Sequence, residues 1–273
     1  MLPDDLHQLR AALGAAIDER DDLHPLRERV EQAAEACVIF RETKQHDDED
    51  ASPVGCCKIG GLPDLPDALQ WPTHEGKGLP FVAQLDLSTL PRWQDCPLPT
   101  SGYLWLFALV NDDHYPPLTA VLFAEATAGD LKRRALPEAM HGDWSDYTLY
   151  DAAEVAGEVS LSIDLEQTLG DDYDDDEVFD ALHELIDTFN TSDRYDGSQP
   201  AGQMLGTMNF PDETPAGLAE MFGKDGDDWM SLVEVQSVGS MMWSDMGILS
   251  FCIRRSQLEQ RDFSDVFSCV LSS

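Results

Sequence analysis

Apolar residues recur at helical spacing near the start of the chain. Four of them lie three or four positions apart: Leu6, Leu9, Leu13 and Ile17. Pro25 then opens a second stretch that continues through Leu26, Val30 and Ala33 at the same spacing. Because this spacing places apolar side chains on one face of a helix, it predicts a helical pair within an N-terminal segment, residues 1–37.

Short apolar runs bounded by Pro, Gly or Asn-Asp occupy much of the remaining chain, and such runs are typical of buried strands. The predicted strands are Cys37–Phe40, Phe81–Leu87, Tyr103–Val110, Leu118–Glu125, Val159–Leu165, Leu232–Val235, Gly247–Ile253 and Val266–Leu271. Between the last two, Ser256–Arg261 is expected to form a short helix or turn. Together with the helices, these runs predict an α+β fold with mainly antiparallel sheets, in which the N-terminal helices pack outside.

Two segments between the apolar runs are predicted to be loops. Gln45–Pro53 is polar and acidic, and Gly60–Pro72 is rich in Gly and Pro, which disfavour both a helix and a central strand. A third segment, Asp174–Phe189, is predicted to be a helix because its apolar residues share one helical face. An acidic run at its start suits the positive end of the helix dipole.

The two halves of the strand region resemble each other. When Gln84 is aligned with Glu234, and Gly102 with Gly247, apolar residues coincide: Val82 with Leu232, Leu85 with Val235, Leu104 with Leu249, and Leu106 with Phe251. Chance matching of strand residues is the alternative explanation. We expect one domain over 38–273 made of two diverged repeats, about 38–165 and 200–273, joined by an acidic helical segment.

The charge balance of the chain excludes several classes of function. Lys and Arg number 17 against 53 Asp and Glu, so the formal net charge is −36 over 273 residues. Nucleic acid and anionic membranes are unsuitable ligands, because both bind through Lys and Arg. No apolar run approaches the ~20 residues of a membrane span, and the first residues lack the order of a signal peptide. We therefore expect a cytoplasmic protein.

Acidic residues are concentrated in short runs. The densest are Asp47–Asp50, Asp171–Glu177 and Asp225–Asp228, which lie between apolar segments. Two explanations remain open: the charge serves binding, or it reflects the composition of a salt-adapted host.

At this point the order of motifs resembles a known family. GGLPDLP is followed by Trp-Pro, PFVAQLDLS and GYLWLF, and the chain ends in MMWSDMGILSFCIRRSQLEQRDFSDVFSCVLS. This order resembles the YwqG-like family, a bacterial group classed as a domain of unknown function, from about residue 38 to the end. The resemblance implies an α+β fold with antiparallel sheet and internal pseudo-symmetry, and it implies no established activity. Asn209-Phe210 departs from the aromatic-Pro step expected there.

The sequence predicts neither a metal site, nor a cofactor, nor a catalytic residue. His183 and Asp187 lie one helical turn apart without an evident third ligand, and no C-x-x-C pair is present. The run Asp171–Glu177 has the alternate spacing of a calcium loop but lacks its Gly and its final Glu. No G-x-S-x-G elbow or catalytic Cys signature occurs, so we interpret the six cysteines as reduced thiols.

The Gly- and Pro-rich loop is the best candidate for recognition, since a Pro-stiffened loop loses little entropy on binding and Trp offers a large contact. The candidate binding residues are Lys58, Gly60, Gly61, Pro63, Leu65, Pro66, Trp71, Gln84, Trp243, Asp245 and Arg254. The alternative is that the apolar members of this set only close the open end of a sheet.

Three hypotheses follow. The first is a non-catalytic acidic protein that captures a basic protein partner, as an immunity protein captures a toxin. The second is an enzyme of unknown reaction that uses a cleft between the repeats, with Asp245 and a base such as Lys58. The third is a structural protein whose acidity reflects its host. We favour the first, and the sequence leaves the oligomeric state open.

Overall fold

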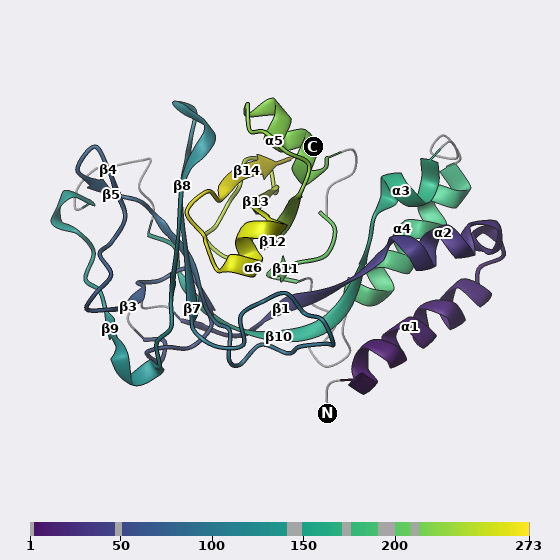
Figure 1. The fold of residues 1–273 in the computed structure, drawn as a ribbon, viewed down its shortest axis with the longest axis horizontal. Helices are drawn as coiled ribbons and strands as arrows, with labels where there is room; N and C mark the ends of the chain where they lie inside the picture. The colour runs from purple at the N-terminus through teal and green to yellow at the C-terminus, as the bar shows by residue number, and fades with distance from the viewer. Residues whose placement is uncertain are drawn as a thin grey trace.

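The structure is a computed structural model that describes residues 3–46, 51–140, 149–170, 176–190, 200–208 and 213–272. Within these ranges, a helical unit lies at one end of a large, curled antiparallel sheet (Figure 1). The predicted α+β class with mainly antiparallel sheets is therefore confirmed. Of the helices in these ranges, none combines the length and the hydrophobicity that a bilayer crossing requires.

The helical unit combines the N-terminal helices with two helices from the middle of the chain. Its elements are α1 (Pro3–Asp18), the 3-10 helix η1 (Asp21–Leu26), α2 (Arg27–Ala33), α3 (Leu165–Leu169) and α4 (Asp176–Asn190). Leu13 and Ile17 of α1 are buried against Leu182 and Leu185 of α4 in a core separate from that of the sheet. The helices extend away from the sheet at the ends of two long strands (Figure 1), which confirms that the N-terminal helices pack outside.

Ten strands form the main sheet in the order β14-β13-β12-β11-β1-β10-β2-β6-β7-β8. Their bounds are β1 (Ala34–His46), β2 (Lys58–Ile59), β6 (Phe81–Asp86), β7 (Tyr103–Asn111), β8 (His114–Ala124), β10 (Ala152–Ile163), β11 (Gly202–Met204), β12 (Trp229–Gln236), β13 (Ile248–Arg254) and β14 (Phe267–Leu271). Each neighbouring pair is antiparallel.

Short elements surround this sheet. They are β3 (Asp64–Pro66), β4 (Thr73–His74), β5 (Lys77–Gly78), β9 (Leu131–Arg133), the 3-10 helices η2 (Ala128–Asp130) and η3 (Glu138–Met140), α5 (Pro215–Met221) and α6 (Arg255–Gln260). β3 pairs with β9, and β4 pairs with β5. The Gly- and Pro-rich loop thus crosses the outer face of the sheet and is held there by β9.

The sheet curls until its two edge strands meet. Thr119 of β8 and Ser268 of β14 are joined by a hydrogen bond of 2.5 Å between their hydroxyl oxygens. Phe123 and Phe263 pack with their ring centroids 5.3 Å apart. The curl encloses the largest apolar core, to which both halves of the sheet contribute. Exposed strand edges invite pairing with other chains, and this contact protects both edges.

The strand order is symmetric about the central pair, β1 and β10. On one side follow β2, β6, β7 and β8, which we call the first set; on the other follow β11, β12, β13 and β14, the second set. Along the chain, β1 comes directly before the first set, but in the sheet it pairs with β11 of the second set. Likewise, β10 comes before the second set along the chain but pairs with β2 of the first set. The division into repeats at 38–165 and 200–273 stays a prediction. β10 lies within the first of these ranges, but it leads into the second set as β1 leads into the first.

The registers of the two sets also correspond. Gln84 lies opposite Trp105 and Glu234 opposite Ser250, as the sequence alignment of Gln84 with Glu234 requires. Each set has one register irregularity, between Phe81 and Ala83 in the first and between Ser231 and Val233 in the second. A shared irregularity at aligned positions supports a common origin better than matching apolar residues alone.

The sequence predicted the strands better than their ends. β1 begins three residues before the predicted Cys37, and β10 begins at Ala152 rather than at Val159. The loop predicted from Gln45 is wrong at its first two residues, because Gln45 and His46 pair with the early residues of β10. The acidic runs 47–50 and 171–175 and the step 209–210 lie outside the described residues.

Candidate functional site

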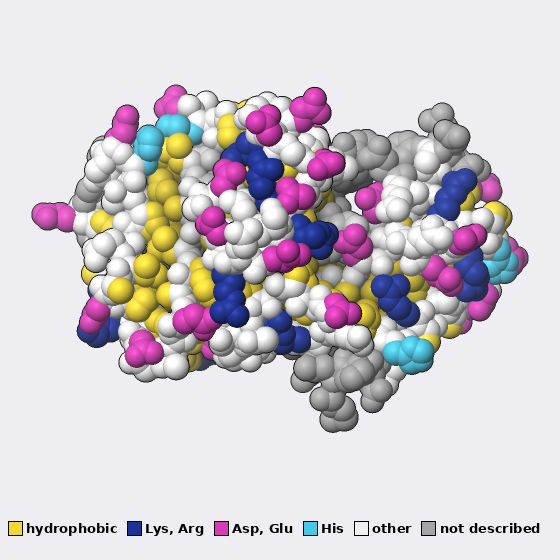
Figure 2. Space-filling view, in the orientation of Figure 1, with side chains coloured by type: hydrophobic (Ala, Val, Ile, Leu, Met, Phe, Trp, Pro, Cys, Tyr) yellow, Lys and Arg dark blue, Asp and Glu magenta, His cyan; other side chains and the backbone are white. Residues whose placement is uncertain are grey.

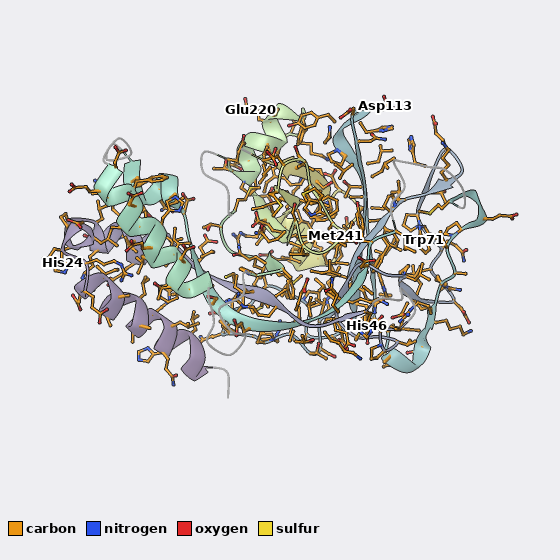
Figure 3. All side chains as sticks on the ribbon, turned by 180° about the vertical axis from the view of Figure 1, so that it is seen from behind. His24, His46, Trp71, Asp113, Glu220 and Met241 are labelled. Atoms are coloured by element: carbon orange, nitrogen blue, oxygen red, sulfur yellow. The ribbon has the colours of Figure 1, made fainter. Side chains whose placement is uncertain are left out.

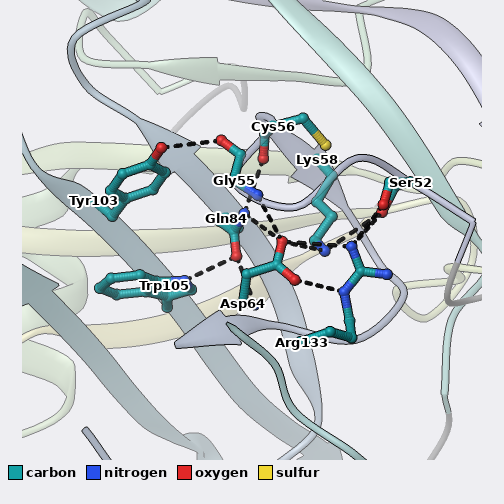
Figure 4. A network of polar contacts seen from close by, with 9 residues as sticks. All are labelled: Ser52, Gly55, Cys56, Lys58, Asp64, Gln84, Tyr103, Trp105 and Arg133. Atoms are coloured by element: carbon teal, nitrogen blue, oxygen red, sulfur yellow. Dashed lines mark hydrogen bonds and ion pairs between the residues drawn. The ribbon is translucent and has the colours of Figure 1, made fainter. Parts of the chain in front are cut away.

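The predicted recognition loop is organised around a buried carboxylate, Asp64 (Figure 4). Asp64 begins β3, and Lys58 begins β2; neither side chain is exposed to solvent. Lys58 Nζ lies 3.0 Å from Asp64 Oδ2 and 3.4 Å from the Ser52 hydroxyl. A buried ion pair of this kind is stable only when further hydrogen bonds complete it.

Arg133 completes the network from β9. Its Nε donates to Asp64 Oδ1 over 2.5 Å, and its Nη2 donates to the carbonyl oxygen of Ser52 over 2.7 Å. The backbone N–H of Gly55 donates to Asp64 Oδ2 over 3.0 Å. Two cations and one carboxylate therefore hold three segments of chain together, those around Ser52, Asp64 and Arg133.

Gln84 uses both ends of its amide in this network (Figure 4). Its Oε1 accepts from the backbone N–H of Asp64 over 2.8 Å and from Trp105 Nε1 over 2.9 Å. Its Nε2 donates to the carbonyl oxygen of Cys56 over 3.0 Å and to Asp64 Oδ2 over 3.1 Å. A side chain with both donors and acceptors is required here, because a carboxylate could not donate to either oxygen.

The charges shift each other's protonation equilibria. Burial alone raises the pKa of Asp64, but Arg133 and Lys58 outweigh burial and bring the pKa below its ordinary value. Burial lowers the pKa of the Lys58 amine, and the attraction of Asp64 offsets this only in part. Asp64 is therefore ionised at neutral pH. Lys58 and Asp64 are enclosed, so the network stabilises the loop and neither of these two charges is open to a ligand in this conformation.

Gly60 and Gly61 turn the chain sharply out of β2. Both have left-handed backbone conformations, with φ of 71° and 69°. The N–H of Gly60 donates to the carbonyl oxygen of Val82, and that of Gly61 to the carbonyl oxygen of Tyr150. A Cβ on Gly60 would lie 2.1 Å from the carbonyl oxygen of Asp151. Both the conformation and this close approach favour glycine.

The rest of the loop is mostly covered. Pro63 and Leu65 are buried, and Pro66 and Trp71 are half-buried. Trp71 packs edge-on against Phe107 with ring centroids 5.8 Å apart, and its Nε1 donates to the carbonyl oxygen of Leu79 over 2.8 Å. The partly exposed edge of Trp71 is the aromatic surface that this loop presents to solvent.

The remaining candidates lie in two other places. Trp243 is buried, with its ring centroid 5.4 Å from that of Tyr150, whose carbonyl accepts from Gly61; Trp243 is thus linked to the glycine pair through one residue. Asp245 is exposed in the turn that follows. Arg254 belongs to a separate cluster, with its guanidinium 4.3 Å from the Trp229 ring and 3.5 Å from Asp228.

The structure therefore brings part of the predicted set together. Lys58 and Gln84 share the network around Asp64, and Gly60 and Gly61 form the turn directly after Lys58 and Ile59, while Asp245 and Arg254 do not touch the network. The enzyme hypothesis pairs Asp245 with Lys58 as a base. In this conformation Lys58 is enclosed and Asp245 is exposed, so the two side chains do not face one common substrate position. Their roles in binding stay predictions.

The sequence interpretation missed Asp64 and Arg133, the two residues that contribute most to the network. Asp64 had a detectable signal, because a charged residue between two Pro in an apolar loop requires a partner. Arg133 had none, since it reaches Asp64 across 69 positions of sequence.

Outside the network, the described basic side chains are largely engaged. Ion pairs involve Arg27, Arg41, Lys132, Arg134, Lys224, Arg254 and Arg261. Acidic side chains are scattered over the face in Figure 2, except along an apolar strip on its left side. Asp113, between β7 and β8, and Glu220 of α5 project outward at the top of the view in Figure 3, whereas Met241 is buried in the main core. The exposed surface of the described residues is therefore negative.

The chain belongs to the family described as domain of unknown function (DUF1963), which matches residues 57–270. This range contains both strand sets and begins at the end of the loop that carries Ser52. A comparison with the curated proteins finds no match.

Proposed function

We propose that this chain is a YwqG-like, non-catalytic binding protein of the cytoplasm that captures a basic protein partner, as an immunity protein does. The observation that carries the proposal is the charge surplus: 53 acidic residues against 17 basic ones, most of the described basic side chains being already paired with acids. The unpaired carboxylates face solvent, where they attract a positive surface over distances comparable to the Debye length.

The physical consequence is a fast, salt-sensitive encounter. Complementary charges raise association rates mainly at low salt, and exposed rim charges act on association more than on dissociation. Buried aromatic anchors act on dissociation. In this chain, the exposed carboxylates of α4 and the half-buried Trp71 represent these two classes.

The test begins with the basic protein that the chain retains from its own cells, purified and measured by stopped-flow mixing. We expect the association rate to fall steeply between low and physiological salt. The variant Asp180→Lys with Glu184→Lys reverses two exposed charges of α4 and should slow association, whereas Asp180→Asn with Glu184→Gln should slow it less. Equal rates at both salt concentrations, or equal rates with cytochrome c as an unrelated basic protein, would contradict capture of a specific partner.

A second measurement separates the loop from the surface charge. If Trp71 anchors the partner, Trp71→Ala raises the dissociation rate and leaves association nearly unchanged. The control is Trp93→Ala, which removes another partly buried tryptophan that packs against the main core. A similar effect of both variants would indicate a general loss of stability instead of a lost contact.

The third hypothesis, acidity that reflects a salt-adapted host, is favoured by acidic side chains that lie on both the sheet and the helical end of the face in Figure 2. It predicts that the free energy of unfolding is low at low salt and rises steeply with KCl until the Debye length is short, because salt screens the self-repulsion of the surface. Chemical denaturation at increasing KCl measures this. A free energy of unfolding that is nearly the same at low and high KCl supports the binding proposal instead.

A further inference from the structure

A cavity of about 540 Å³ lies between the helical unit and the second strand set. α3 and α4 border it on one side, and β12 with the residues before α5 borders it on the other (Figure 1). Its volume falls within the ~300–1,000 Å³ typical of small-molecule sites. None of the candidate binding residues predicted from the sequence lines it.

Two polar atoms of the lining lack partners within the described part of the chain. They are Ser231 Oγ of β12 and His183 Nε2 of α4, and both atoms are closed off from solvent. Ser231 is 1% exposed. Buried polar groups are almost always hydrogen-bonded, because an unsatisfied one costs free energy. A hydroxyl oxygen accepts a hydrogen bond, and so does an unprotonated imidazole nitrogen. A donor that enters the cavity would satisfy either atom once that side chain turns toward it.

The charge of the lining specifies what kind of donor fits. Glu35, Asp164, Asp187 and Glu213 contribute carboxylates, against the single guanidinium of Arg255. When carboxylates line a cleft whose walls have a low dielectric constant, their negative potentials add and are focused inside the cleft. An anion would be repelled there, whereas a cation would be attracted.

The walls between these charges are apolar. Met208, Trp229 and Ile248 are buried residues that line the cavity, and Met230 and Met246 line it as well. Methionine side chains adapt to ligands of irregular shape. The cavity thus combines an apolar wall with acidic groups and unsatisfied acceptors.

The first strand set supplies an internal comparison. Ser231 aligns with Phe81, and Ile248 with Tyr103, as the registers of β12 with β13 and of β6 with β7 show. Phe81 packs against Phe107 with ring centroids 5.4 Å apart, so the first set fills this position with an aromatic ring. The second set has a hydroxyl at the same position, which leaves room.

We propose that this cavity binds a small organic cation, an ammonium or guanidinium group on an apolar stem. The cation donates a hydrogen bond to Ser231 Oγ or His183 Nε2 once that side chain turns toward it, its charge faces the carboxylates, and its stem lies against the methionines. The source of this group is either a free amine or a Lys or Arg side chain of a bound protein. The inference does not rest on the proposed capture of a basic protein.

The test uses hexylammonium, 1-hexanol and hexanoate, which share an apolar stem and differ in charge. The methyl NMR signals of Met208 and Met230 report on the cavity, and those of Met221 and Met242, which are exposed and do not line it, serve as internal controls. Met246 lines the cavity but is left out because it is 65% exposed. We expect hexylammonium to shift the first group alone and to bind about tenfold more tightly than hexanol, as one charge interaction allows. Equal binding of hexylammonium and hexanol overturns the proposal, and so do shifts confined to Met221 and Met242.

Glu213→Gln and Ser231→Ala should each weaken hexylammonium several-fold. Glu220→Gln, on the exposed side of α5, is the matched control and should leave binding unchanged. Unchanged binding in Glu213→Gln and Ser231→Ala, with an unchanged circular dichroism spectrum, also overturns the proposal.

A second titration with the blocked peptide acetyl-Gly-Lys-Gly-amide identifies the source of the cation. Shifts of the same methyl groups indicate a side chain of a partner, and binding by hexylammonium alone indicates a free amine.

Discussion

The two strand sets share one topology but differ in what they place on their outer faces. In the first set, Lys58 lies opposite Gln84; in the second, Gln203 lies opposite Glu234 at the corresponding positions. The pair thus carries a buried cation in one set and a buried carboxylate in the other. In the first set, the loop packed on the sheet supplies the counter-charge, Asp64.

The glycine turns show the same relation. Gly60 and Gly61 correspond to Leu205 and Gly206, and all four have left-handed backbone conformations. The second set therefore accepts a leucine where the first has glycine. The left-handed conformation alone does not demand glycine at this position; the carbonyl oxygen of Asp151 next to Gly60 does. The first set is closed by its loop, and the second is open to a cavity.

The largest effect expected is from removing the central carboxylate of the first set. Asp64→Ala leaves Lys58 and Arg133 buried without their counter-charge, which should cost about 3–5 kcal/mol of unfolding free energy. Urea denaturation monitored by Trp fluorescence measures it. Arg10→Ala, which removes an arginine remote from the network, is the control. A cost of Asp64→Ala under about 1 kcal/mol would show that the network is solvated in solution.

The next effect distinguishes conformation from crowding at the glycine turn. Gly60→Ala should cost about 3 kcal/mol or more, since it adds a backbone clash to the ~1–2 kcal/mol of a left-handed alanine. Gly76 is the matched control, because its φ is +80° and a Cβ added there would meet no atom within 4 Å. Gly76→Ala should cost only the conformational part. Equal losses in thermal unfolding would mean that the clash at Gly60 relaxes.

A smaller effect depends on pH and again belongs to the first set. The folded pKa of Asp64 lies below its unfolded value, so its contribution to stability is complete above the unfolded pKa, roughly 4. It is lost as the pH falls through the folded pKa. The free energy of unfolding should therefore decrease more steeply below about pH 4 in the wild type than in Asp64→Asn. Parallel curves for the two proteins would contradict the shift.

The smallest effect expected is from a hydroxyl of the second set. Ser231→Ala removes a buried, unpartnered Oγ, so stability should stay constant or rise by up to about 1 kcal/mol. Ser160 is the matched control, since its buried hydroxyl donates to the carbonyl oxygen of Phe189 over 2.8 Å. Ser160→Ala should lose about 1 kcal/mol. A comparable loss in both variants would show that Ser231 has a hydrogen-bond partner in solution.

The sequence was sufficient for the N-terminal helices, α4, α6, the principal strands and the correspondence of Gln84 with Glu234, but not for α3 and α5. Each of these depends on local periodicity or on a pattern repeated along the chain, and both are readable from residue types. The short strands β2, β9 and β11 were missed because two or three residues carry no periodicity. They exist because longer neighbours offer them hydrogen bonds.

By itself, the sequence determined the α+β class, the negative charge and the loop character of the Gly- and Pro-rich segment, because these follow from composition and local sterics. Only the tertiary structure decided that Lys58 is enclosed, that Arg133 completes its network, and that Ser231 lines a cavity instead of packing like Phe81. Partners separated by 69 residues, such as Arg133 and Asp64, become neighbours only when the sheet has formed. A cavity, likewise, is a property of surfaces that meet and of no single segment.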